Sequence, residues 1–313
     1  MKLLLGLLCI TFAALAAAQR ECNSPTVVTD VALDVAAHPD GKPTVADVYG
    51  CFEGQPLVVL FPGFGQPKER YSLFATALAK KRFNVLVPFH GVGLGPPGSP
   101  LQNLVSPPVL TQAIEWAKTQ SGIDVDSTTL IGHSFGGGQM FYTLQGECPI
   151  PFCFPPNTAY ALPAELRVAM AYGTSLSNRF GSGFVEGVSN MGFPVFWANG
   201  DGDQINLSDA DGTFDRLVSP KAYSIIENMD HFSISNDVYS ERENEVLSTR
   251  SRQDQVDEVV ETVALWIDEQ LNDDSSASSS GDGDSTDISA DGSFCDVLFD
   301  ERESTVDCVE DFS

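Results

Sequence analysis

Basic residues are scarce in this chain of 313 residues, which has 17 lysines and arginines against 43 aspartates and glutamates and a formal net charge of −26 at pH 7. A surface this negative repels phosphate groups and anionic lipid heads. The sequence also lacks stripes of basic residues interleaved with aromatic ones, which nucleic-acid binding modules use. The composition therefore argues against nucleic acid as a partner.

Histidine is also scarce, and the pattern of metal ligands that an enzyme centre needs is missing. The four histidines are His38, His90, His133 and His231, and no two lie at a spacing such as HExxH. The cysteines form no CxxC pair, and the acidic stretch 201–215 lacks the glycine and glutamate positions of an EF-hand. We expect no bound metal and no cofactor.

Long apolar runs are absent after the first 18 residues, so no later segment approaches the ~20 apolar residues that a membrane helix needs. Residues 1–18 contain Lys2, a short apolar run and three closing alanines, the layout of a secretory signal. We expect cleavage after Ala18, with an uncleaved anchor as the alternative. The mature chain is expected to be soluble and either secreted or in the endomembrane lumen, and a multi-step route to a plastid is a further possibility.

Cysteine is present in an even number once Cys9 of the signal is set aside. An even set in a chain that enters an oxidising compartment predicts structural disulfides. Proximity in sequence favours the pairs Cys22 with Cys51, Cys148 with Cys153, and Cys295 with Cys308. In addition, Asn206 begins an Asn-Leu-Ser sequon and is a candidate for glycosylation.

The composition changes abruptly after residue 271, and the chain from there on holds 13 acidic residues and one basic residue. Residues 272–294 are rich in Ser, Asp and Gly and are predicted to form a disordered linker. Residues 295–313 are expected to be a short acidic tail tied by a disulfide, or an interaction tail. The remaining part, 19–271, is predicted to be one globular domain.

Within that domain, short apolar or β-branched runs alternate with longer segments of helical periodicity, which predicts an α/β fold with a mostly parallel sheet flanked by helices. The predicted strands are 57–61, 83–89, 128–131, 166–172, 193–199 and 222–226. The predicted helices are 71–81, 109–119, 135–144 and 254–271.

The strongest motif is Gly132-His133-Ser134-Phe135-Gly136, a G-x-S-x-G sequence between a predicted strand and a predicted helix. In that setting the glycines give room for a strained turn that exposes a nucleophilic serine above the sheet edge. The motif therefore predicts Ser134 as a catalytic nucleophile.

A nucleophilic serine needs a base and an acid, and at such an elbow these follow in the chain order Ser, acid, His. Only His231 lies downstream of Ser134 beyond the motif itself, just after the last predicted strand. Asp203 follows the preceding strand and is the expected acid, with Asp201 as the alternative. The sequence thus predicts a Ser134, Asp203 and His231 triad.

An oxyanion hole requires two backbone N–H donors, one after the nucleophile and one in the loop after an earlier strand. Phe135 is the expected first donor. Phe64, in the turn Pro62-Gly63-Phe64-Gly65, is the expected second. Segments that leave the carboxyl ends of strands, after Phe89, Tyr172 and His231, are expected to line a partly open cleft.

With these motifs in this order, the region from about 54 to 271 resembles the α/β-hydrolases. Within them it is most similar to the branch of chlorophyllases, dienelactone-hydrolase-like and platelet-activating-factor-acetylhydrolase-like esterases and cutinase-like polyester hydrolases. The resemblance implies ester hydrolysis through an acyl-enzyme, without a cofactor. Phe135 stands where chlorophyllases typically have arginine, and the stretch 173–183 lacks the tryptophan of polyester hydrolases.

The leading interpretation is a serine carboxylester hydrolase acting on an apolar ester of a small molecule or lipid, with a chlorophyll-type phytyl ester, a lipid and a polyester as candidate substrates. A non-catalytic binding or adhesive protein on the same scaffold is the alternative from a different class. A serine peptidase is disfavoured because the sequence contains no separate cap or propeller domain to select peptides. The oligomeric state is left open.

Overall fold

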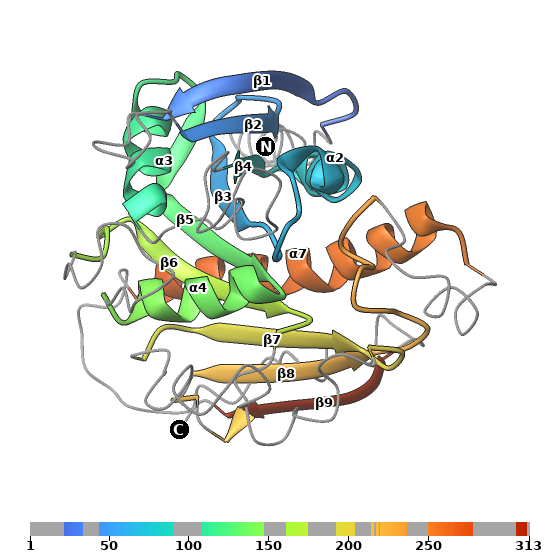
Figure 1. Cartoon of the computed structure of the whole chain (residues 1–313). Coiled ribbons are helices and arrows are strands. Elements are labelled where there is room, and N and C mark those ends of the chain that lie inside the picture. The colour runs from blue at the N-terminus through green and yellow to red at the C-terminus, as the bar shows by residue number, and fades with distance from the viewer. Residues whose placement is uncertain are drawn as a thin grey trace, which may run out of the picture.

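A computed structural model describes residues 22–33, 44–89, 108–146, 161–174, 192–203, 214–215, 217–218, 220–236, 250–277 and 305–311 (Figure 1). The strands in these ranges are β1 (Thr26–Leu33), β2 (Thr44–Gly50), β3 (Gln55–Phe61), β4 (Asn84–Phe89), β5 (Ile123–His133), β6 (Leu166–Tyr172), β7 (Val195–Gly200), β8 (Lys221–Ile226) and β9 (Thr305–Asp311). The helices are η1 (Lys68–Tyr71), α2 (Ser72–Lys80), α3 (Pro108–Lys118), α4 (Phe135–Leu144) and α7 (Arg252–Ala277).

All nine strands belong to one sheet in the order β1-β2-β4-β3-β5-β6-β7-β8-β9. The strands from β4 to β8 in this order pair in parallel, whereas β1, β2 and β9 are joined to their neighbours antiparallel. The predicted α/β class with a mostly parallel sheet is therefore confirmed.

Helices cover both faces of the sheet, with α2 and α7 on one face and α3 and α4 on the other (Figure 1). Strand β3 shows how the sequence produces two cores. Its side chains alternate, so that Val58 and Leu60 pack toward α2 and α7 while Val59 and Phe61 pack toward α3 and α4. Because both faces are buried, such a strand reads as a continuous apolar run.

Every predicted strand and helix of the domain has a counterpart, and helix 135–144 and strand 166–172 keep their predicted bounds. Strands β1 and β2 were not predicted. Strand β1 lies at the sheet edge and is mostly exposed, so it lacks the apolar signature of the central strands.

Helix α7 continues to Ala277 and so extends into the stretch 272–294 that is predicted as a linker. Within the predicted acidic tail 295–313, residues 305–311 pair antiparallel with β8 as strand β9. The high acidic content of this segment did not exclude a strand, because an edge strand exposes one side to water and tolerates acidic residues. The rest of the predicted linker lies outside the described residues.

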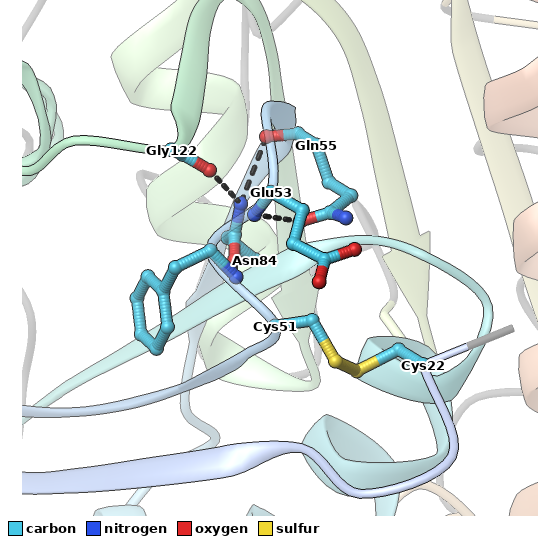
Figure 2. Close-up of a disulfide and its surroundings, with 7 residues drawn as sticks. Cys22, Cys51, Glu53, Gln55, Asn84 and Gly122 are labelled. Carbon is cyan, nitrogen blue, oxygen red and sulfur yellow. Dashed lines mark hydrogen bonds between the residues drawn. A yellow bond between two sulfur atoms is a disulfide. The ribbon is translucent and has the colours of Figure 1, made fainter. Parts of the chain in front are cut away.

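The disulfide between Cys22 and Cys51 is present, with the two Cα atoms 5.9 Å apart, which confirms that predicted pair (Figure 2). It connects the segment before β1 to the end of β2. The second predicted pair and Cys295 lie outside the described residues, as do the signal segment 1–18 and the sequon at Asn206, so these remain predictions.

Beside this disulfide, Asn84 joins the amino ends of three neighbouring segments (Figure 2). Its Nδ2 donates to the backbone oxygens of Gln55 at 2.9 Å and Gly122 at 3.3 Å. Its Oδ1 accepts the backbone N–H of Phe52 at 3.3 Å. Gly122 has a φ of +93°, and a Cβ there would lie 1.8 Å from the Phe52 oxygen, so only glycine fits this contact.

Among the described helices, none combines the length and the apolar composition that crossing a membrane requires.

Candidate functional site

Ser134 occupies a sharp turn between β5, which ends at His133, and α4, which begins at Phe135. Its backbone has φ 53° and ψ −120°, a combination that non-glycine residues rarely adopt. A Cβ on Gly132 would lie 2.4 Å from the Gly137 Cα, and one on Gly136 would lie 2.2 Å from the Phe61 oxygen. Both glycines of the motif are therefore required by close backbone packing, as the sequence predicted.

The three residues predicted as a triad lie together at the carboxyl edge of the sheet. The Ser134 Oγ lies 2.9 Å from His231 Nε2, and His231 Nδ1 lies 3.0 Å from Asp203 Oδ2. The Asp203 carboxylate is completely buried and His231 is 2% exposed, whereas Ser134 is partly accessible. The arrangement holds the imidazole between a hydroxyl that it can deprotonate and a carboxylate that fixes its orientation.

The two candidate acids differ in their position relative to His231. Asp201 is exposed and its Oδ1 accepts the backbone N–H of Met229 at 3.3 Å. Asp203 instead faces the imidazole ring of His231, and Gly173 packs against both: a Cβ on Gly173 would lie 3.0 Å from His231 Nδ1 and 3.3 Å from Asp203 Oδ2.

His133, which precedes the serine, is completely buried, and each of its ring nitrogens has a hydrogen-bond partner other than Ser134. Its Nδ1 lies 2.7 Å from the Tyr71 hydroxyl oxygen, and its Nε2 lies 2.8 Å from the backbone oxygen of His231. A carbonyl oxygen only accepts, so Nε2 carries the proton and Nδ1 accepts the Tyr71 hydroxyl proton. Burial and the neighbouring His231 lower the pKa of His133 to about 3, so the ring is neutral at pH 7.

The loop that carries His231, residues 229–236, is called the histidine loop below. Three successive backbone oxygens of this loop accept hydrogen bonds from the ends of three adjacent strands. The Met229 oxygen accepts the backbone N–H of Gly202, just after β7, at 2.9 Å. The Asp230 oxygen accepts the hydroxyl of Tyr172 on β6 at 2.8 Å. The His231 oxygen accepts from Nε2 of His133 on β5. The catalytic histidine candidate is thus held through its backbone as well as its ring.

The side chain of Asp230 fixes the same loop from the other side. Its carboxylate accepts the backbone N–H of Phe232 at 2.7 Å and the hydroxyl of Ser233 at 3.1 Å. It also forms a two-pronged ion pair with Arg252 at the start of α7, with N–O distances of 3.1 and 3.0 Å. These contacts of Asp230 fix the conformation of the turn and do not involve the imidazole ring of His231.

The predicted oxyanion loop follows β3 and packs directly against the serine. A Cβ on Gly63 would lie 3.3 Å from Ser134 Cβ and 3.0 Å from His133 Nδ1, so this approach depends on glycine. The aromatic rings of Phe64 and Phe135 meet edge to face with centroids 5.9 Å apart, and the Phe64 residue is 40% exposed. The two predicted oxyanion residues thus lie side by side next to the nucleophile.

The segment after the oxyanion loop is anchored at two points. Lys68 is buried and its Nζ forms ion pairs with Asp47 at 2.6 Å and Asp30 at 3.1 Å; burial opposes its charge, but its hydrogen bonds to acidic side chains raise its pKa. Asn236 of the histidine loop accepts the backbone N–H of Leu73 at 2.9 Å and donates to the Ser72 hydroxyl at 2.7 Å. The start of α2 is therefore capped by the histidine loop.

The predicted cleft walls, 90–107 and most of the stretches after Tyr172 and after the histidine loop, lie outside the described residues. In the part of the chain that is described, no group of three or more His, Cys, Asp or Glu side chains could hold a metal ion.

The sequence did not identify the residues that support the triad. Tyr71, Tyr172 and Arg252 belong to no local motif. Their partners at the site lie 62, 58 and 22 residues away in sequence, respectively. Asp230 does carry a local signal, since an aspartate three residues before a serine is typical of a capped turn.

The fold and this site define an α/β protein with a serine, histidine and aspartate aligned at the carboxyl edge of a mostly parallel sheet. No family model and no curated protein matches this chain.

Proposed function

We propose that this chain is a serine carboxylester hydrolase of the α/β-hydrolase type that acts on apolar esters. The observation that carries the proposal is the hydrogen-bonded line from Ser134 Oγ to His231 Nε2 at 2.9 Å and from His231 Nδ1 to Asp203 Oδ2 at 3.0 Å. The strand, strained turn and helix around Ser134, and the chain order Ser, Asp, His, are the context that gives the G-x-S-x-G motif its meaning.

In the proposed reaction, His231 Nε2 takes the hydroxyl proton of Ser134 while the Oγ attacks the ester carbonyl carbon. Asp203 stabilises the imidazolium that forms. The protonated His231 then gives its proton to the leaving alkoxide oxygen, which departs as the alcohol and leaves an acyl group on Oγ. A water molecule, deprotonated by the same ring, releases the acid and restores the serine.

The negative oxygen of the tetrahedral intermediate would be bound by the backbone N–H groups of Phe64 and Phe135, as the sequence predicts. Support for this assignment comes from the packing of Gly63 against Ser134 and from the position of Phe135 at the start of α4. The amino end of a helix also carries a partial positive charge, which favours an oxyanion there.

The substrate class is inferred from the surface beside the nucleophile. The rings of Phe64 and Phe135 form an apolar edge there, and Phe64 remains 40% exposed. Such a surface suits an apolar acyl or alcohol group more than a charged one. The candidate substrates are a pigment phytyl ester, a lipid and a polyester. The Cys22–Cys51 disulfide supports an oxidising compartment, consistent with the proposed secreted or lumenal location.

The test is hydrolysis of p-nitrophenyl esters from acetate to palmitate, with a pigment phytyl ester alongside, by the purified mature protein and its Ser134→Ala variant. Hydrolysis that is lost in the variant is expected, together with labelling of Ser134 by a fluorophosphonate. A folded protein that neither hydrolyses these esters nor reacts with the probe would overturn the proposal and favour a non-catalytic binding protein.

A further inference from the structure

We infer that Tyr71 and His133 form a buried positioning relay that couples the oxyanion loop to the catalytic histidine. This inference rests on the proposed function and adds two residues to its site. Neither residue touches the reacting atoms, so each acts through others.

The relay is a continuous line of hydrogen bonds between two backbone groups. The N–H of Gly63 donates to the Tyr71 hydroxyl oxygen at 2.7 Å, and this hydroxyl lies 2.7 Å from His133 Nδ1. At the far end, His133 Nε2 lies 2.8 Å from the backbone oxygen of His231.

Only one placement of the protons satisfies all three bonds. The His231 carbonyl requires a proton on His133 Nε2, which leaves Nδ1 of the neutral ring as an acceptor. Tyr71 must then donate its hydroxyl proton to Nδ1 while its oxygen accepts from Gly63. Every bond therefore points in one direction along the line, and reversing any one of them would place two donors or two acceptors face to face.

The position of each end gives the relay its effect. Gly63 precedes Phe64, the expected oxyanion donor, and packs against Ser134. The other end is the backbone of His231, the base that contacts Ser134 Oγ at 2.9 Å. Movement of either end along this line changes where the oxyanion donor and the base lie relative to each other. Transition-state stabilisation is sensitive to such shifts, since a displacement of 1 Å can cost about 100-fold in rate.

The relay also requires a neutral His133. The ring centroids of His133 and His231 are 5.1 Å apart, so two positive rings here would repel each other when His231 accepts the serine proton. The titratable groups that face His133 are Tyr71 from η1, Tyr172 from β6, and His231 and Asp203 from the triad. Burial of the ring and electrostatic repulsion from the His231 ring lower the His133 pKa. Together they outweigh the hydrogen bond to the His231 backbone oxygen and the Asp203 charge, which both raise it.

The first experiment compares Tyr71→Phe with Tyr49→Phe, a matched removal of one hydroxyl from a tyrosine that is buried in the same core but lies on β2. Tyr71→Phe is expected to lower kcat for a p-nitrophenyl ester by about tenfold or more with KM changed less than about threefold. Tyr49→Phe is expected to leave both within about twofold.

A second readout separates positioning from a loss of folded protein. A trifluoromethyl ketone forms a tetrahedral adduct with the serine, and its inhibition constant does not depend on what fraction of the sample is folded. In Tyr71→Phe this constant should rise by the same factor as kcat/KM falls, as expected for a transition-state analogue. His133→Gln, whose amide can still donate to the His231 carbonyl, should retain more activity than His133→Leu.

The protonation pattern of His133 can be tested independently of activity by ¹⁵N NMR of the histidine rings. The relay requires a protonated Nε2 and an unprotonated Nδ1 at pH 7, and a proton on Nδ1 would overturn it. An active wild type with unchanged kcat and inhibition constant in Tyr71→Phe would overturn the relay alone. A wild type without serine-dependent hydrolysis would overturn the proposed function and, with it, the relay.

Discussion

Hydrogen bonds to backbone groups of neighbouring segments hold both the amino edge and the carboxyl edge of the parallel sheet, but the residues that form these bonds differ. At the amino edge, the side chain of Asn84 satisfies backbone groups of three segments beside the Cys22–Cys51 disulfide (Figure 2). At the carboxyl edge, donors from three strands satisfy successive carbonyls of the histidine loop. The amino edge uses groups that do not titrate, whereas the carboxyl edge uses a histidine and a tyrosine next to the proposed reacting groups.

The hydrogen bonding of the backbone and the proposed chemistry are therefore separable in this fold. Changes at the amino edge should alter the free energy of unfolding and leave turnover intact. Changes at the carboxyl edge should alter turnover more than stability. Four variants or conditions test that separation, in decreasing order of expected effect.

The largest effect is expected from Asp203→Asn at the carboxyl edge. The amide keeps the shape of the carboxylate but cannot stabilise the imidazolium and favours the wrong tautomer of His231, so kcat should fall by about 10⁴-fold. Asp201→Asn is the matched control two residues away and should stay within about threefold. Steady-state ester hydrolysis measures both, and a larger loss in the control would transfer the role of the acid to Asp201.

At the amino edge, replacing both Cys22 and Cys51 by serine removes a crosslink that spans 29 residues of chain. The entropy gained by the unfolded chain should lower the free energy of unfolding by about 3 to 4 kcal/mol. Denaturant unfolding measures this loss, and kcat of the folded variant should be unchanged. A tenfold fall in kcat would show that the two edges are coupled.

Asn84→Ala tests a second stabilising feature of the amino edge. It removes two hydrogen bonds to the backbone oxygens of Gln55 and Gly122 and the acceptor of the Phe52 N–H, which should cost about 2 to 4 kcal/mol of stability. Gln120→Ala, which shortens a partly exposed side chain two residues before Gly122, should remain within about 0.5 kcal/mol. Equal unfolding midpoints for the two variants would contradict the structural role given to Asn84.

The smallest effect concerns pH. The folded-state pKa of His133 is about 3, below its ordinary value of 6.5, so between these values the unfolded chain binds a proton that the folded chain does not. The stabilising contribution is complete above pH 6.5 and decreases as the pH falls, by about 1.4 kcal/mol per pH unit. Denaturant unfolding at pH 7, 6 and 5 should show this slope in the wild type and a shallower one in His133→Gln. Parallel slopes in the two proteins would count against a neutral buried His133.

The features that the sequence predicted are those encoded by a local motif, by chain order or by a continuous apolar run. Ser134 and the fold of its elbow follow from a local motif whose glycines are required by packing within a few ångströms. His231 and Asp203 followed from chain order, because strands that run parallel bring their carboxyl ends to one edge. The central strands were predicted since burial on both faces leaves a continuous apolar run.

The remaining features depend on contacts that no local pattern encodes. Tyr71 and His133 are 62 residues apart, and Leu73 and Asn236 are 163 residues apart. Each pair is specified only once the strands and helices have packed. The edge strands β1 and β9 were missed for a related reason. An edge strand is held mainly by backbone pairing with its neighbour, and its composition does not show which strand that neighbour is.

The position of β9 in the chain has a consequence for biosynthesis. Strand β8 ends at Ile226, but its outer partner begins only at Thr305. At about 5 to 20 residues per second, a ribosome needs several seconds to deliver that partner. During this interval the nascent chain exposes the backbone N–H and C=O groups of β8 along one side, an adhesive edge for which a chaperone or a neighbouring nascent chain can compete.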